Sequence, residues 1–350
     1  MTIRIGINGV GRIGRNLWRI IHSNAPEVEV EVAVVNDTAD LATVAHLLRY
    51  DTVRGRFAGD LDVTGEAIAV DGVPVPVRHE PRPDLIPWSA HGVDLVVEST
   101  GQFTRGGTAR GHLRGGARRV IISTASPDAD VSVMMGINEQ VFDPRRHRVV
   151  SNSCCTTYCL GTMIHGLHHV YGVTSGAATV AYSHGSRPGP LLDDTFGDAC
   201  EPNRNRGPNL RMARANATNI VPANVPGVRH ALDRVLPELA GRIAATAMRV
   251  PVRATSAAAL TLRLLHPADA EHVNGTLEAA AASLLKGYLE VSQDPLVSSD
   301  AIGSPASSVV DAGLTTTNGD LVQVVGWYDN EWGYAHRLVD LIRFIARLSQ

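Results

Sequence analysis

The sequence predicts an α/β fold in two parts, and two changes of pattern along its 350 residues indicate it. Over residues 1–150, short β-branched runs alternate with helical stretches, which is typical of a parallel sheet covered by helices. Beyond residue 155, longer extended segments indicate an α+β arrangement with a mostly antiparallel sheet. The composition, 44% hydrophobic and 19% charged, is that of an ordinary globular protein.

The expected elements follow from local periodicity. In the first part, strands are expected at 3–8, 29–36, 66–71, 94–98, 119–123 and 148–151. In the second part, extended segments are expected at 176–184, 244–253, 257–266 and 321–328, with helices at about 156–170, 227–238 and 268–286. A final helix is expected at 332–348. The stretch 185–215, rich in Gly, Pro, Asp, Asn and Arg, is expected to be a long ordered loop.

A glycine-rich turn follows the first expected strand and opens an amphipathic helix that ends near residue 23. It reads Gly9-Val10-Gly11-Arg12-Ile13-Gly14. Glycines at this spacing allow a tight turn and let a pyrophosphate approach the helix N-terminus. The pattern therefore predicts a Rossmann-type dinucleotide-binding domain, with Gly9, Gly11, Arg12 and Ile13 at the cofactor.

Asp37 ends the second expected strand, about twenty residues beyond the last glycine of the turn. A carboxylate at this place accepts hydrogen bonds from the adenosine ribose hydroxyls and repels a 2′-phosphate. NAD is therefore favoured over NADP. A helix-capping role for Asp37, ahead of residues 38–41, is an alternative that is compatible with ribose binding.

Residues 151–159, Ser-Asn-Ser-Cys-Cys-Thr-Thr-Tyr-Cys, place Cys155 where a strand gives way to a helix. Backbone N–H groups and the helix dipole favour a thiolate there. A thiolate can attack a carbonyl carbon and form a covalent intermediate. The alternative is a buried structural cysteine.

Several classes of function are disfavoured by composition. A net charge of −3 gives no general reason to expect nucleic acid or an anionic membrane as a partner. The apolar runs are far shorter than the roughly 18 residues of a spanning helix. The chain enters directly as a strand, with no leader-like segment, which favours the cytoplasm. Three cysteines within residues 154–159 form neither a disulfide framework nor a complete zinc pattern, so no metal is expected.

The cysteine segment closely resembles the active site of the phosphorylating glyceraldehyde-3-phosphate dehydrogenases, usually Ser-Asn-Ala-Ser-Cys-Thr-Thr-Asn-Cys. The resemblance covers essentially the whole chain. It continues in Gly6 to Arg15, His46-Leu47-Leu48-Arg49-Tyr50-Asp51, Glu98-Ser99-Thr100-Gly101 and Trp327 to Tyr334. It implies an NAD-binding domain at 1–154, completed by a C-terminal helix at 332–350, and a catalytic domain at 155–331. It also implies a small-molecule substrate and a homotetramer.

In the family that the chain resembles, the cysteine attacks an aldehyde, a hydride passes to the nicotinamide, and inorganic phosphate cleaves the resulting thioester. By similarity, Cys155 is the nucleophile. Asn330 is expected to hold the nicotinamide carboxamide with Tyr334 packed beside it, and Ser123 is also expected at the cofactor.

The resemblance fails at the catalytic base. The family places a histidine 27 positions after the cysteine, and here that position is Tyr182. An imidazole titrates near pH 6.5 and a phenol near 10, so an ordinary tyrosine is a poor base at neutral pH. Tyr182 can still donate a hydrogen bond to an oxyanion. His184, two residues on, is a substitute base if the strand continues, and a surface or structural histidine otherwise.

The expected anion sites are mixed. The threonine that follows the family's histidine falls at Gly185, and a later loop hydroxyl is replaced near Val225. Arginines are retained at the positions that the resemblance assigns to anions, although a solvated loop face is the alternative for the first two. These are Arg211, Arg214 and Arg249. The substrate-binding residues expected overall are Ser153, Cys154, Thr156, Tyr158, Arg211 and Arg249, with Tyr158 adding bulk beside the nucleophile.

These observations favour an NAD-dependent oxidoreductase of this family that acts on an aldehyde or acyl substrate through a cysteine thiohemiacetal and thioester, without being an efficient glycolytic enzyme. Three alternatives stay open. They are a divergent but genuine glyceraldehyde-3-phosphate dehydrogenase, a non-redox cysteine-dependent enzyme, and an NAD-binding protein without catalysis.

Overall fold

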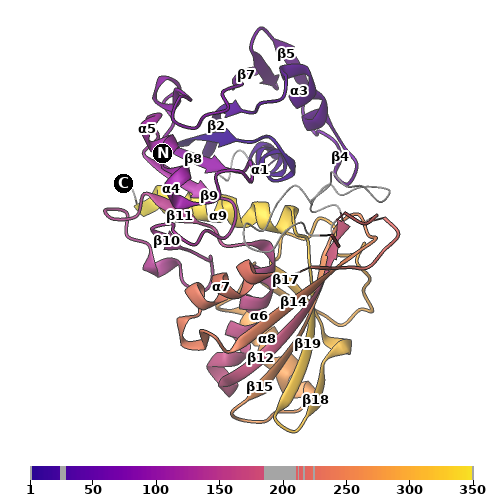
Figure 1. Cartoon of the computed structure of the whole chain (residues 1–350). Coiled ribbons are helices and arrows are strands. Elements are labelled where there is room, and N and C mark those ends of the chain that lie inside the picture. Colours follow the sequence, from indigo (N-terminus) through magenta and orange to yellow (C-terminus); the bar gives the residue numbers. More distant parts are fainter. Residues whose placement is uncertain are drawn as a thin grey trace. The chain divides into compact units, whose positions relative to one another are not determined.

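The computed structural model describes residues 2–23, 29–184, 210–211, 213–215, 217–223 and 225–348 (Figure 1). The chain divides into two compact units. The first comprises Met1–Cys154 with Tyr334–Gln350, and the second comprises Cys155–Gly333.

The first unit contains a largely parallel sheet with the strand order β10-β11-β9-β8-β1-β2-β7-β6-β5. Neighbours from β10 to β7 are parallel, whereas β7-β6-β5 is an antiparallel meander. The central strands are apolar on both faces, as expected for a parallel sheet that is covered on both sides. The Rossmann-type sheet predicted from the sequence is therefore confirmed.

The strands of this unit are β1 (Ile3–Asn8), β2 (Val30–Asn36), β3 (Tyr50–Asp51), β4 (Gly55–Arg56), β5 (Leu61–Thr64), β6 (Ala67–Val70), β7 (Val73–Arg78), β8 (Leu95–Glu98), β9 (Arg119–Ile122), β10 (Val131–Ser132) and β11 (Val149–Ser151). Its helical segments are α1 (Arg12–Ser23), α3 (Leu41–Arg49), η1 (Trp88–His91), α4 (Gly106–Ala109), α5 (Gly111–Arg114) and η2 (Glu139–Val141).

The second unit contains the predicted, mostly antiparallel sheet, with the order β13-β14-β12-β15-β19-β17-β16 and with β18 on β19. Helix α6 contacts β12, β15, β17 and β19 of this sheet, and α7 and α8 contact α6 (Figure 1). The apolar residues Leu160, Met163, Ile164 and Leu167 of α6 are fully buried. Burial of this face stabilises the helix whose first residue is Cys155.

The strands of the second unit are β12 (Val173–Ser183), β13 (Val221–Ala223), β14 (Ile243–Val250), β15 (Ser256–Leu264), β16 (Leu289–Ser292), β17 (Ser308–Asp311), β18 (Thr316–Asn318) and β19 (Leu321–Tyr328). Its helical segments are α6 (Cys155–Tyr171), α7 (Pro226–Val235), η5 (Pro237–Leu239), α8 (Ala270–Ala282) and η6 (Ala312–Leu314), and α9 (Trp332–Leu348) begins at its end.

Helix ends follow local chemistry. Helix α9 has the predicted bounds, and the Asp329 carboxylate accepts hydrogen bonds from the backbone N–H groups of Glu331 and Trp332 at its start. Helix α7 ends at Val235, three residues earlier than expected, because Pro237 disfavours helical backbone at the residue before it. The loop expected at 185–215 lies almost entirely outside the described residues. Among the described helices, none is both long and apolar enough to cross a membrane.

Candidate active site

The turn between β1 and α1 depends on glycine at two positions. Gly9 has φ +92°, and a Cβ there would lie 2.7 Å from the backbone nitrogen of Thr100. A Cβ on Gly14 would lie 2.1 Å from the Gly9 carbonyl oxygen. Gly11 has no atom within 4 Å of its Cβ position, so space remains open in front of the helix. Arg12 and Ile13 follow in the first turn of α1, and both are half-buried.

Asp37 ties the end of β2 to this turn. Its Oδ2 accepts a hydrogen bond from the backbone N–H of Val10 at 2.7 Å, and its Oδ1 accepts one from Ala39 at 2.9 Å. The cap of α3 is Asp40, which accepts from the backbone N–H of Thr43 at 2.8 Å. The capping role considered for Asp37 therefore belongs to Asp40.

A cavity of about 160 Å³ opens beside Asp37 within the first unit. The residues around it are Asn8, Gly9, Gly11, Asn36, Asp37, Thr38, Glu80, Pro81, Ser99, Thr100, Gln102 and Phe103. An open glycine turn, a helix start and a carboxylate on one cavity fit the adenosine half of NAD. Ser123 lies at the end of β9, where its backbone N–H donates to the Glu98 carbonyl at 3.0 Å.

A buried polar network underlies this cavity, and sequence analysis did not identify it as a network. Glu98 is 2% exposed and accepts hydrogen bonds from the Asn8 side chain at 2.6 Å and from the Thr100 backbone at 2.8 Å. His112 contacts the same carboxylate at 2.9 Å, and its Nδ1 accepts from the Trp88 indole at 3.1 Å. Because the indole can only donate, the proton of a neutral His112 lies on Nε2 and points at Glu98. The network fixes the cavity residues Asn8 and Thr100.

Cys155 is the first residue of α6, as the sequence predicts. Two residues before it, Ser153 has φ +54°, a left-handed conformation that costs a non-glycine residue roughly 1–2 kcal/mol. The hydroxyl of Tyr334 donates to the carbonyl oxygens of Ser153 and Asn152 at 3.2 and 3.4 Å. Tyr334, expected beside the nicotinamide, thus also holds the turn that precedes the cysteine.

Three hydroxyl groups meet beside Cys155. Thr156 Oγ1 is 2.5 Å from the Tyr182 hydroxyl, 2.9 Å from the Tyr328 hydroxyl and 4.0 Å from Cys155 Sγ. Burial raises the pKa of Tyr328 well above its ordinary value, and neighbouring Tyr182 and Cys155 raise it further. Tyr328 was not among the predicted site residues, because the sequence around an aromatic residue at the end of a strand does not indicate the hydrogen-bond partner of its hydroxyl.

The polar residues around Tyr182 come from neighbouring strands. Arg249 of β14 is the in-register partner of Tyr182, so both side chains project from the same face of the sheet. His184 lies beyond the last residue of β12, so strand alternation does not extend to it. The Ser183 hydroxyl donates to Asn330 Oδ1 at 3.5 Å, which brings Asn330 to the end of β12.

Other predicted residues have different surroundings. Arg211 and Arg214 are exposed and share one turn, in which the Arg214 N–H donates to the Arg211 carbonyl at 3.3 Å. Tyr158 is 1% exposed and belongs to the core around α6. Cys154 is half-buried and directly precedes Cys155. Gly185 lies outside the described residues.

The two thiols of α6 differ sharply. Cys159 is fully buried one turn beyond Cys155, and its sulfur lies 3.6 Å from the Ser308 hydroxyl. Burial raises the pKa of the Cys159 thiol to about 12, so this thiol is neutral at physiological pH. Of the two, only Cys155 has the position of a reactive nucleophile.

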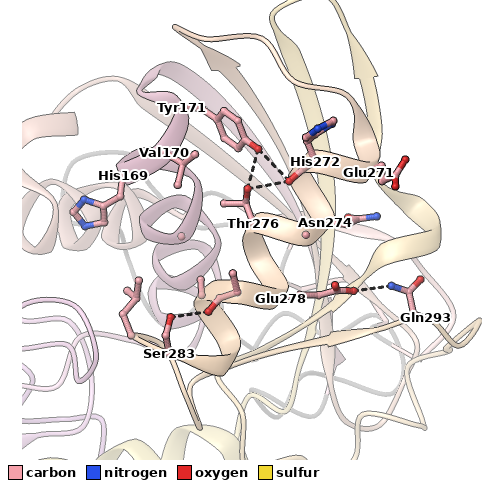
Figure 2. A pocket seen from close by; sticks show the side chains of 15 residues that line it. His169, Val170, Tyr171, Glu271, His272, Asn274, Thr276, Glu278, Ser283 and Gln293 are labelled. Atoms are coloured by element: carbon pink, nitrogen blue, oxygen red, sulfur yellow. Dashed lines mark hydrogen bonds between the residues drawn. The ribbon is translucent and has the colours of Figure 1, made fainter.

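The second unit also carries an open groove of about 920 Å³ between α6 and α8 (Figure 2). The Tyr171 hydroxyl meets Thr276 Oγ1 at 2.8 Å and donates to the His272 carbonyl at 3.0 Å, closing one end. The groove contains none of the residues predicted for catalysis or cofactor binding.

The parallel sheet with its glycine turn and carboxylate is that of an NAD-binding domain, and comparison with known proteins specifies the class of protein that carries it. Residues 3–106 match the NAD binding domain of glyceraldehyde 3-phosphate dehydrogenase, and residues 154–330 match its C-terminal domain. The chain belongs to the glyceraldehyde-3-phosphate dehydrogenase family.

Relatives match over nearly the full length. Glyceraldehyde-3-phosphate dehydrogenase 2 of Streptomyces arenae is 45% identical over 346 residues, which is 99% of both chains. Glyceraldehyde-3-phosphate dehydrogenase 1 of Streptomyces avermitilis is 44% identical to this chain. Glyceraldehyde-3-phosphate dehydrogenase of Geobacillus stearothermophilus is 42% identical, and each match covers 99% of both chains.

Proposed function

We propose that this chain oxidises an aldehyde, or handles the corresponding acyl group, through covalent attachment to Cys155. The thiolate attacks the carbonyl carbon, a carbon–sulfur bond forms, and the π electron pair of the carbonyl passes to its oxygen. The start of α6 favours the thiolate, because the positive end of the helix dipole stabilises negative charge there. The thiohemiacetal oxygen then carries charge that hydrogen-bond donors can stabilise.

Tyr182 is the donor that we assign to this oxygen. Its hydroxyl contacts Thr156, the residue after the nucleophile, and Arg249 on the neighbouring strand favours an anionic group on the same face. When bound, NAD would supply the hydride acceptor that oxidation of the thiohemiacetal requires. Asn330, fixed by Ser183 at the end of β12, is the residue that we assign to orienting the carboxamide. The NAD-binding domain of 1–154 with 332–350 and the catalytic domain of 155–331 are part of this proposal.

The observation that carries the proposal is the tyrosine at position 182. Its hydroxyl is placed to donate hydrogen bonds, yet an ordinary phenol is in its basic form only about one time in a thousand at neutral pH. As a general base it is handicapped by roughly 4 kcal/mol, or about a thousandfold in rate. We therefore propose that the protein is a poor glyceraldehyde-3-phosphate dehydrogenase and that its pocket serves another aldehyde or acyl substrate.

A genuine glyceraldehyde-3-phosphate dehydrogenase is the second candidate, favoured by the names of relatives that are 40–45% identical. In that case the proton is taken by another group, with His184 the nearest imidazole along the chain to Tyr182. The homotetramer and the cytoplasmic location expected from the sequence stay predictions, and light scattering tests the first.

Steady-state kinetics with glyceraldehyde 3-phosphate, NAD and inorganic phosphate distinguish the two candidates. We expect turnover roughly a thousandfold below the tens per second of an ordinary enzyme. Tyr182→His should recover part of the deficit by supplying an imidazole. Tyr182→Phe, which keeps the ring and removes the hydroxyl, should lower acylation of Cys155 further, by about 10²-fold.

Two results would overturn the proposal. Turnover of tens per second in the unaltered chain would show that another group serves as the base. Unchanged acylation in Tyr182→Phe would show that the hydroxyl does not contact the reacting oxygen. If the unaltered chain is slow, a screen of aldehydes that follows NADH absorbance identifies the preferred substrate.

A further inference from the structure

Two histidines of α6 lie one helical turn apart, away from the first turn that carries Cys155. His165 and His169 stand at positions i and i+4, on the same face of the helix. Their Nε2 atoms are 3.3 Å apart. Two histidines at this spacing on a helix are a known arrangement for holding a zinc ion.

The separation between the two nitrogens matches the span of a bound metal. A tetrahedral Zn²⁺ with Zn–N bonds of about 2.0–2.1 Å holds two ligating nitrogens roughly 3.3–3.4 Å apart. The observed 3.3 Å lies in this range, so the two nitrogens already stand at the separation that a shared cation requires. The rings, with centroids 4.4 Å apart and planes at 79°, need only a side-chain rotation to aim both lone pairs at one cation.

The His169 side chain has room for that rotation, whereas His165 is half-buried. His169 is exposed, and Figure 2 shows its ring directed away from α8. Between the pair, His168 Nδ1 accepts a hydrogen bond from the Val173 backbone at 2.9 Å, so that nitrogen is already engaged.

We propose that His165 and His169 chelate a late first-row divalent cation, Zn²⁺, Ni²⁺ or Cu²⁺, at the surface of α6. Among the described residues no three histidine, cysteine, aspartate or glutamate side chains form a ready metal centre. The site therefore has two protein ligands, and water occupies the other positions. Binding replaces the hydrogen bond between the two rings, because each Nε2 must then present a lone pair and each proton must lie on Nδ1.

Calorimetric titration with Ni²⁺ tests the proposal. The titrated protein carries Cys154→Ser, Cys155→Ser and Cys200→Ser, because thiolates would otherwise bind the metal, and it keeps Cys159, which is fully buried. We expect one site per chain, with Cu²⁺ binding more tightly than Ni²⁺ and Ni²⁺ more tightly than Co²⁺. In the same background, His165→Ala and His169→Ala should each weaken Ni²⁺ binding at least about 10–100-fold. The variant with both histidines replaced should bind Ni²⁺ only slightly more weakly than either single variant, because removing one nitrogen already abolishes chelation.

The matched control is His46→Ala, which removes an exposed helical histidine from α3 and should leave affinity unchanged. A second readout is the melting temperature, which saturating Ni²⁺ should raise in the control but not in His169→Ala. Equal affinity in His169→Ala and the control overturns the proposal. The proposal is also overturned if the losses of Ni²⁺ binding free energy in the two single variants add up to the loss in the double variant. His169→Gln, a polar change at an exposed position, repeats the test if His165→Ala fails to fold.

Discussion

Two strand-to-helix turns of the chain are of functional interest, and they differ in the residues that form them and in the group that they present. The turn from β1 to α1 uses glycine, so that the space beside Gly11 in front of the helix stays open. The turn from β11 to α6 uses Ser153 in a left-handed conformation and ends on a side chain, Cys155. The first turn exposes backbone to bind a ligand, and the second accepts backbone strain to present a thiol. Substitutions at three places, the thiol, the glycines and Ser153, test this difference.

The largest effect is expected at the thiol. Cys155→Ser should lower turnover on any accepted aldehyde by at least about a thousandfold, because a serine hydroxyl is far less acidic and less nucleophilic than a thiol. Cys159→Ser is the control from the same helix, since the Cys159 thiol has a pKa of about 12 and is buried away from the surface. Progress curves for both variants, with circular dichroism to check folding, give the comparison. Equal losses in the two would remove Cys155 from the mechanism.

The next effect is expected at the glycines. Gly9→Ala should lower the free energy of unfolding by about 1–3 kcal/mol, because φ is +92° and the new Cβ meets the Thr100 backbone. Gly11→Ala should change it by less than about 0.5 kcal/mol, because no atom lies within 4 Å of the new Cβ. NAD affinity should nevertheless fall in Gly11→Ala, whose methyl group enters the cavity. Urea unfolding and NAD titration separate these effects, and a stable Gly9→Ala would contradict the argument from strain.

The smallest effect is expected at Ser153. Ser153→Gly should raise the free energy of unfolding by about 0.5–1.5 kcal/mol, because glycine relieves the left-handed strain. It also removes a buried hydroxyl that has no hydrogen-bond partner among the described residues. If the strain serves to aim Cys155, the more stable variant should be the slower enzyme. Thermal melts beside alkylation rates of Cys155 check this, and a loss of stability would show that the turn is relaxed.

The first turn was predictable from the sequence because its requirements are local. Glycine spacing, a preceding apolar strand and a carboxylate about twenty residues on are all visible in a linear chain. Helix α9 was predicted with its observed bounds for a similar reason, since its apolar face recurs regularly over 332–348. Strand β7 was not predicted, because Pro74 and Pro76 interrupt it and only its pairing with β6 and β2 reveals it.

The second turn was only half predictable. The position of Cys155 at the start of a helix follows from its neighbours, but its hydroxyl partners come from β12 and β19, which are distant in sequence. Tyr182 was found because a known pattern expects histidine there, whereas Tyr328 lies in the recognised segment from Trp327 to Tyr334 but had no role assigned to it. The histidine pair was missed for another reason. Both histidines fall within a predicted helix, so their spacing of four residues was visible in the sequence. The 3.3 Å between their ring nitrogens depends on side-chain conformations that the sequence does not show.

The three hydroxyl groups beside Cys155 have only one proton each to donate. Thr156 has one proton to give, yet it faces Tyr182, Tyr328 and the Cys155 sulfur. When sulfur is a thiolate, the best use of that proton is toward sulfur, and both tyrosines then donate to Thr156. In the mechanism proposed above, sulfur becomes bound to carbon and then accepts a hydrogen bond less strongly. Thr156 can then donate to Tyr182, which leaves the Tyr182 proton available to the substrate oxygen. In that mechanism the Tyr182 hydroxyl becomes available as a hydrogen-bond donor only after Cys155 has attacked the carbonyl carbon. The three hydroxyl groups therefore fix the order of these two events.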